Sequence, residues 1–162
     1  MNLRGYAIPF DSPIIADDRV EQVKPGAFAR MLRGRVPVAL QAYDHSPTRP
    51  AIARTGNQSL ELFEDNHGLA FQAELSRCDY ENLALYIAQG AGCSVNFTRR
   101  KLDGDAIVEA HIDHIAVTTN PAYRQTACWF ADADLSMTPF ALQQLAHRWQ
   151  EGYARHLSRP VP

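Results

Sequence analysis

The chain alternates between apolar and polar residues over many short runs, a pattern that is typical of β-strands. It is clearest at four apolar positions separated by single residues: Leu69, Phe71, Ala73 and Leu75. Leu60 and Leu62 alternate in the same way, and the polar segment 64–68 between the two runs predicts a hairpin turn. The same criterion predicts five further strands, over 3–10, 19–24, 36–43, 92–98 and 106–118.

Three other segments carry helical signals. A brief helix is expected after Pro25-Gly26, because proline suits a first helical turn. A second helix is expected over 80–89, with Asp79 as its N-cap and Gly90 at its end. A third is expected to start with Thr138 as cap and Pro139 in its first turn. Its apolar stripe is formed by Leu142, Leu145, Trp149 and Tyr153. Together the elements predict one α+β domain, with antiparallel strands in a closed or half-closed sheet and helices around it.

Composition and charge exclude several classes of function. A net charge of −2 leaves no basic excess for general nucleic-acid binding. The three cysteines, at 78, 93 and 128, are too few for a disulfide scaffold and lack the Cys-x-x-Cys spacing of metal ligands. No apolar run approaches the ~20 residues that span a bilayer, and the first residues lack a signal-peptide core. We therefore expect a soluble intracellular protein with no metal, cofactor, membrane or nucleic-acid partner.

Ser94 is the first candidate for chemistry, because it lies on the polar face of the predicted strand 92–98 with Asn96 and Thr98. Its small neighbour Gly92 leaves room for a substrate backbone to approach. By the same alternation, Cys93 turns toward the core, where a thiol is a packing residue. Most serines on strands have no catalytic role, so position alone does not identify a nucleophile.

Histidines supply the candidate bases. His45 follows Asp44 at a strand end and could accept a serine proton near neutral pH. His111, Asp113 and His114 share the strand 106–118, and alternation puts the first two on one face and His114 on the other. That split makes a metal site a weak interpretation of this cluster. The chain has neither a Gly-x-Ser-x-Gly elbow nor a glycine-rich phosphate loop, which disfavours α/β-hydrolase and nucleotide chemistry.

Six segments, in order along the chain, resemble the prohead serine protease family of tailed phages. They are Gly5-Tyr6-Ala7; Pro25-Gly26-Ala27-Phe28 with Leu32; Tyr43-Asp44-His45; Gly68-Leu69 with Ala73 and Leu75; Cys93-Ser94-Val95-Asn96-Phe97; and Val117-Thr118 with Pro121-Ala122-Tyr123. The resemblance implies a fold like that of the herpesvirus assemblins, a small antiparallel β-barrel surrounded by helices. It places the protease domain at 1–130 and leaves a C-terminal tail, 131–162, whose amphipathic helix could cover the barrel, mediate self-association or be removed by self-cleavage.

The resemblance also implies a serine endopeptidase in which Ser94 is the nucleophile and His45 the general base. The third member is expected on the strand before Val117-Thr118, where the phage family is expected to have a carboxylate. Here His114 stands at that position, and assemblins use a second histidine in this role. Asp113 takes the role instead if the strand register differs by one residue. A neutral third imidazole stabilises the imidazolium less than a carboxylate does, so we expect slow turnover.

The oxyanion of the reaction requires backbone N–H groups or a cation. By analogy with the assemblin arginines, Arg124 is the candidate, and Arg99 and Arg100 are alternatives nearer to Ser94 in sequence. The implied substrates are scaffold protein and extensions of the major capsid protein, and self-cleavage could accompany them. The implied place of action is the assembling prohead in the host cytoplasm, with the protease as a homo-oligomer such as a dimer.

Two other functions fit the sequence. The first is a non-catalytic member of the same fold that binds capsid or scaffold protein, a hypothesis supported by the histidine in place of the expected carboxylate. The second is a cysteine hydrolase that uses Cys93, which thiol reagents would inhibit.

Overall fold

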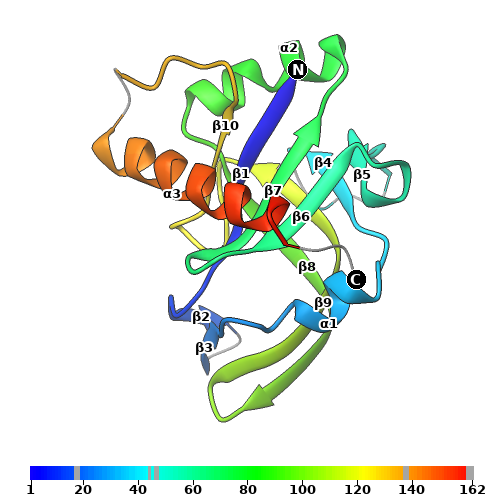
Figure 1. Cartoon of the computed structure of the whole chain (residues 1–162), viewed down its shortest axis with the longest axis vertical. Helices are drawn as coiled ribbons and strands as arrows, with labels where there is room; N and C mark the ends of the chain where they lie inside the picture. Colours follow the sequence, from blue (N-terminus) through cyan, green and yellow to red (C-terminus); the bar gives the residue numbers. More distant parts are fainter. Residues whose placement is uncertain (17–18, 44, 46–47, 137–138, 160–162) are drawn as a thin grey trace.

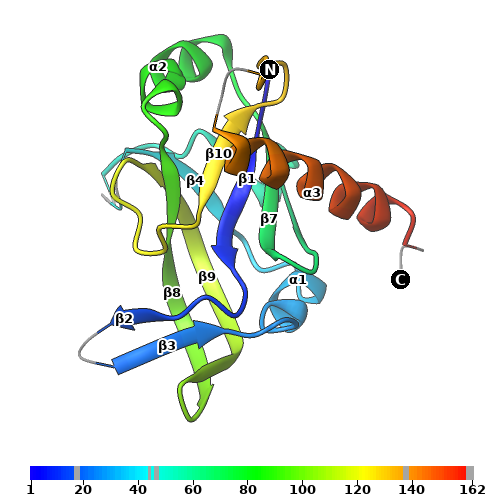
Figure 2. The same cartoon turned by 90° about the vertical axis from the view of Figure 1, so that its left-hand side faces the viewer.

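The computed structural model describes residues 1–16, 19–43, 45, 48–136 and 139–159, and its strands form two sheets (Figures 1 and 2). The first sheet has four antiparallel strands in the order β10-β1-β7-β6. Their bounds are β1 Asn2–Pro9, β6 Leu60–Glu64, β7 Gly68–Glu74 and β10 Ala127–Phe130. The predicted hairpin between β6 and β7 is confirmed.

Helix α3 (Phe140–Leu157) lies across the first sheet (Figure 2). The indole of Trp149 is buried against the ring of Phe63, with 5.5 Å between centroids, and donates its N–H to the Phe71 carbonyl at 3.1 Å. The predicted apolar stripe therefore packs on the sheet and joins the tail to the body of the molecule.

The second sheet has the order β2-β3-β9-β4-β5, and β8 pairs with the other edge of β9. Its strands are β2 Ile14–Ala16, β3 Arg19–Val23, β4 Ala39–Ala42, β5 Ala53–Arg54, β8 Gly92–Asp103 and β9 Ala106–Thr118. A single 3-10 turn, Thr55–Asn57, follows β5.

The expectation of purely antiparallel strands is wrong for two pairs, because β3 and β4 both run parallel to β9. They pair with opposite ends of β9, and helix α1 (Ala29–Arg33) lies in the connection between them. Neither β3 nor β4 is adjacent to β9 along the chain, and the alternation of side chains does not reveal the direction of a distant partner strand. Pairing among the described strands gives two sheets and no closed barrel, so the α+β class is confirmed without the barrel.

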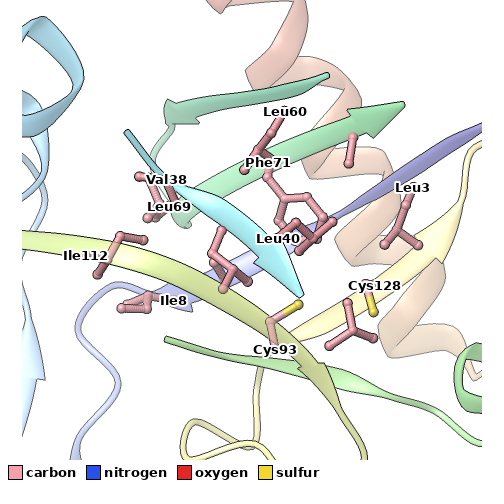
Figure 3. Packing of buried hydrophobic residues seen from close by; sticks show 14 of the residues in the cluster. Leu3, Ile8, Val38, Leu40, Leu60, Leu69, Phe71, Cys93, Ile112 and Cys128 are labelled. Atoms are coloured by element: carbon pink, nitrogen blue, oxygen red, sulfur yellow. The ribbon is translucent and has the colours of Figure 1, made fainter. Parts of the chain in front are cut away.

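The hydrophobic core lies between the two sheets (Figure 3). Leu3 and Phe71 enter it from the first sheet, and Leu40, Cys93 and Ile112 enter it from the second. All five side chains are completely buried.

Several elements differ from expectation: β4 is shorter than the expected strand 36–43, and β8 extends five residues beyond the expected strand 92–98. Helix α2 (Arg77–Ala88) begins one turn early because Ser76 is its N-cap: the Ser76 Oγ accepts the Asp79 N–H at 3.1 Å. Helix α3 begins at Phe140 with Pro139 at the N-cap, and the expected cap Thr138 lies outside the described residues. Strand β10 was not predicted, because a run of four residues is too short to show a period. In the part of the chain described, no helix has the length and apolarity to cross a membrane.

Candidate active site

The pairing of β8 with β9 places Ser94 and His114 on one face of the second sheet. Ser94 lies opposite Ala116, and Asn96 lies opposite His114. The alternate positions Cys93 and Val95 contribute to the core on the other face, as the sequence pattern predicted. Residues directly opposite in an antiparallel pair point to the same side, so Ser94, Asn96 and His114 share the outward face.

A β-bulge adds Asp113 to this face. Asn96 pairs with His114 and the next residue of β8, Phe97, pairs with Ile112, which leaves Asp113 without an opposite residue. Ile112 and Ile115 are both buried, and the two residues between them both leave the core. The prediction that alternation separates Asp113 from His114 is therefore wrong, because a bulge re-aims the side chain of its extra residue.

His45 reaches this face from the end of β4, which runs parallel to β9. The pairing continues to Tyr43, whose N–H donates to the Val117 carbonyl at 2.7 Å. Tyr43 then adopts a positive φ of 78°, and its hydroxyl donates to the Asn82 carbonyl of α2 at 3.2 Å. His45 Nδ1 lies 2.6 Å from His114 Nε2. The structure thus brings together two histidines that are 69 positions apart in the sequence.

Behind His114, a short polar chain continues. His114 Nδ1 lies 2.7 Å from Asp113 Oδ1, and the Asn96 side-chain amide donates to the same oxygen at 3.0 Å. The His114 side chain is 15% exposed and that of Asp113 51% exposed. The sequence pattern assigns Asn96 only to the strand face of Ser94 and gives it no role in the site. Its position two residues after Ser94 on the same strand was the signal that could have identified it as a site residue.

Ser94 itself is only 9% exposed, and the residues before it are held by the loop that follows β9. The Thr126 hydroxyl accepts the Cys93 N–H at 2.9 Å and lies 3.0 Å from the Cys93 carbonyl. A Cβ on Gly92 would meet Thr126 Oγ1 at 2.5 Å and Pro121 Cγ at 2.9 Å. The space beside Gly92 is therefore filled by this loop, which corrects the expectation that it admits a substrate backbone. No sequence signal marked Thr126, because its partner is 33 positions away.

Cys93 is completely buried, as expected (Figure 3). The neighbouring Cys128 thiol and burial raise the pKa of Cys93 well above its ordinary value. Since the thiolate is the nucleophilic form, this environment opposes the cysteine-hydrolase hypothesis.

The three arginine candidates differ in their positions. Arg99 and Arg100 lie about 16 and 20 Å along β8 from Ser94, at ~3.3 Å per residue. Arg100 also pairs with the buried carboxylate of Glu21 at 2.6 Å. Neither suits the oxyanion role. Arg124 is exposed in the loop that Thr126 fixes against Cys93. In the same loop Tyr123 is buried, and desolvation raises its pKa to about 12.

His111 stays apart from this arrangement as far as the described residues show. It pairs with Arg99 further along β9, and its Nε2 is buried without a hydrogen-bond partner there. No group of three or more potential metal ligands occurs within the described ranges.

Comparisons with known proteins give two findings. The model of the family described as caudovirus prohead serine protease matches residues 1–139. Among solved structures, the fold is similar to the crystal structure of KSHV protease in complex with a hexapeptide phosphonate inhibitor. The TM-score is 0.51 at 14% sequence identity, with 99% of this chain and 77% of that chain covered. No curated protein matches the sequence.

Proposed function

Because this chain belongs to the caudovirus prohead serine protease family, we propose that it is a serine endopeptidase with Ser94 as nucleophile, His45 as general base and His114 as third member. The family and the fold support a protease of capsid maturation. The observation that carries the assignment of residues is the 2.6 Å contact between His45 Nδ1 and His114 Nε2.

The hydrogen bond between His45 and His114 is compatible with the tautomer in which His45 can act as a base. If Nδ1 of His114 carries its proton, Nε2 of His114 is an acceptor, and His45 Nδ1–H can donate to it. The basic lone pair of His45 is then on Nε2. In that tautomer His45 can take the Ser94 proton as the hydroxyl attacks a peptide carbonyl, and can return it to the leaving amine.

The register of the sheet supports a place for Ser94 in this arrangement. Ser94 and His114 are diagonal neighbours across β8 and β9, a relation that separates Cα atoms by roughly 7–8 Å. This separation is too wide for a direct contact between the Ser94 and His114 side chains. It suits an arrangement in which the His45 imidazole lies between them. The residue opposite Ser94 is Ala116, and we propose that its small side chain leaves space for the His45 ring beside Ser94.

For the oxyanion we propose Arg124, through its backbone or its side chain, because its loop is fixed beside the residue that precedes Ser94. A substitution that removes the positive charge of Arg124 tests only the contribution of its side chain to oxyanion stabilisation.

The substrates we propose are scaffold protein and extensions of the major capsid protein, cut inside assembling proheads in the host cytoplasm. A histidine as third member stabilises the imidazolium less than a carboxylate would, so we expect slow turnover. Slow turnover is tolerable where enzyme and substrate are confined at high effective concentration. Self-cleavage, a homo-oligomer such as a dimer, and closure of the sheets into a small barrel belong to the same proposal, by analogy with the family and the assemblins.

Co-expression with the capsid protein and scaffold of the same phage tests this function. Cleavage is read by intact mass for the wild type, Ser94→Ala and His45→Ala, with Ser136→Ala as a control in an exposed loop. We expect cleavage by the wild type and the control only. Equal cleavage by Ser94→Ala contradicts the proposal. Binding without cleavage by any folded variant favours the non-catalytic capsid-binding module.

A further inference from the structure

We propose that Asp113 is a positioning residue that fixes the tautomer of His114, so that the catalytic chain has four members and runs Ser94, His45, His114, Asp113. This inference rests on the proposed function. It removes the choice between Asp113 and His114 as third member, since the geometry uses both residues in series.

The backbone of β9 is irregular at Asp113. In regular alternation, consecutive residues of a strand point to opposite faces, and Asp113 would lie away from His114. The bulge opposite Asn96 and Phe97 is what turns both side chains to the outward face. Bulges are frequent next to active sites, where they re-aim a side chain.

The direction of the hydrogen bonds around His114 supports the same role. An ionised carboxylate only accepts, so His114 must donate to Asp113 from Nδ1, over a distance of 2.7 Å. The proton on Nδ1 makes His114 Nε2 an acceptor for His45, which is the polarity that the proposed mechanism needs. Without the carboxylate, His114 is free to carry its proton on Nε2, opposite the His45 Nδ1–H.

Asn96 holds the Asp113 carboxylate from the neighbouring strand. Its amide donates to the same Asp113 oxygen at 3.0 Å, from the strand that carries Ser94. Two donors that converge on one oxygen fix the rotation of the carboxyl group. An ordinary half-exposed ion pair contributes little to stability, about 0–1 kcal/mol, and needs no such second donor.

The exposure of the Asp113 side chain sets the size of the rate loss that we expect when this carboxylate is replaced. Replacement of the buried carboxylate in a Ser-His-Asp triad lowers kcat by about 10⁴-fold through the wrong tautomer. Asp113 is 51% exposed and acts one residue further from the nucleophile, so water can replace part of its effect. We expect a loss of roughly tenfold in the rate of Ser94 acylation.

The test uses two independent readouts on Asp113→Asn, Asp113→Glu and the control Asp103→Asn, which lies at the exposed turn of the same hairpin. The first is the ¹⁵N chemical shift of the His114 ring nitrogens, measured in the full chain with labelled histidine. The second is the maximal rate of labelling by an alkyl fluorophosphonate, separated from the affinity for this probe. We expect Asp113→Asn to move the His114 proton toward Nε2 and to slow labelling without changing probe affinity. Asp113→Glu should restore part of both, and Asp103→Asn should change neither.

The outcomes separate the two proposals. If Asp113→Asn changes neither the tautomer nor the labelling rate while the wild type is labelled at Ser94, this inference is overturned and the proposed function stands. A changed tautomer with an unchanged rate also overturns it, because the carboxylate then has a structural role only. If the folded wild type is not labelled, the proposed function fails, and the positioning role fails with it.

Discussion

At the scale of single residues, the protein places two potential nucleophiles side by side in opposite environments. Ser94 lies on the outward face with the histidines, and Cys93 lies in the core beside Cys128. The neighbouring Cys128 thiol and burial raise the pKa of Cys93, which keeps it in the unreactive thiol form. The accessible cysteine is Cys78, which is exposed on α2.

We predict that brief treatment of the native protein with iodoacetamide adds one adduct, at Cys78, and leaves capsid-protein cleavage unchanged. Unfolding in denaturant should expose all three thiols. Peptide mass spectrometry before and after unfolding measures both. An adduct at Cys93 in the native protein, with parallel loss of cleavage, would support the cysteine hydrolase instead.

The sequence indicated which face of a strand a residue occupies, and it did not indicate where a strand departs from regular alternation. Alternation placed Ser94 outward and Cys93 inward. The ordered resemblance selected His45 and His114 as partners, a pair that the fold brings into contact. The link between Asp113 and His114 was missed, because a bulge depends on the register of two strands and leaves no mark on either.

At the scale of elements, the alternation of side chains predicted the positions of the long strands, although β8 runs five residues past its expected end at Thr98. Strand β9 has the bounds expected for it, and the turn at Asp103-Gly104 ends β8. Pairing direction was wrong for β3 and β4, because their partner β9 is distant in the sequence and the alternation of side chains is the same in either direction. The amphipathic stripe of α3 correctly indicated a packed helix, and the sequence did not say which surface it covers.

We predict that Trp149→Ala lowers the free energy of unfolding by roughly 3–5 kcal/mol, the usual cost of truncating a buried aromatic residue. The indole is buried against the first sheet and bonded to the Phe71 carbonyl. Phe140→Ala on the same helix, where the ring is 71% exposed, should change stability by no more than about 0.5 kcal/mol. Urea unfolding followed by circular dichroism measures both. Equal effects of the two variants would show that α3 does not pack as described.

At the scale of the whole molecule, the proposed catalytic chain comes from two strands, β8 and β9, and from the segment that follows β4, all in a single chain. β8 carries Ser94, β9 carries Asp113 and His114, and the end of β4 leads to His45. The two sheets share one core, so this arrangement does not depend on a second copy of the chain.

We therefore predict that mixing the inactive variants Ser94→Ala and His45→Ala restores no cleavage, whatever the oligomeric state. The two variants would be co-expressed with the capsid protein, and cleavage would be compared with a wild-type dilution series. Recovery of activity above the detection limit of that series would mean that a site is completed between subunits.

The central claim is that Ser94 is a nucleophile activated by His45. The most direct measurement is exposure of the purified, folded chain to an alkyl fluorophosphonate, followed by peptide mass spectrometry to locate the adduct. We predict one adduct, at Ser94 in the wild type, no adduct in Ser94→Ala and labelling slowed by at least ~100-fold in His45→Ala, the usual contribution of a positioned general base. An adduct at another residue, or a rate at Ser94 that is unchanged by His45→Ala, would contradict it.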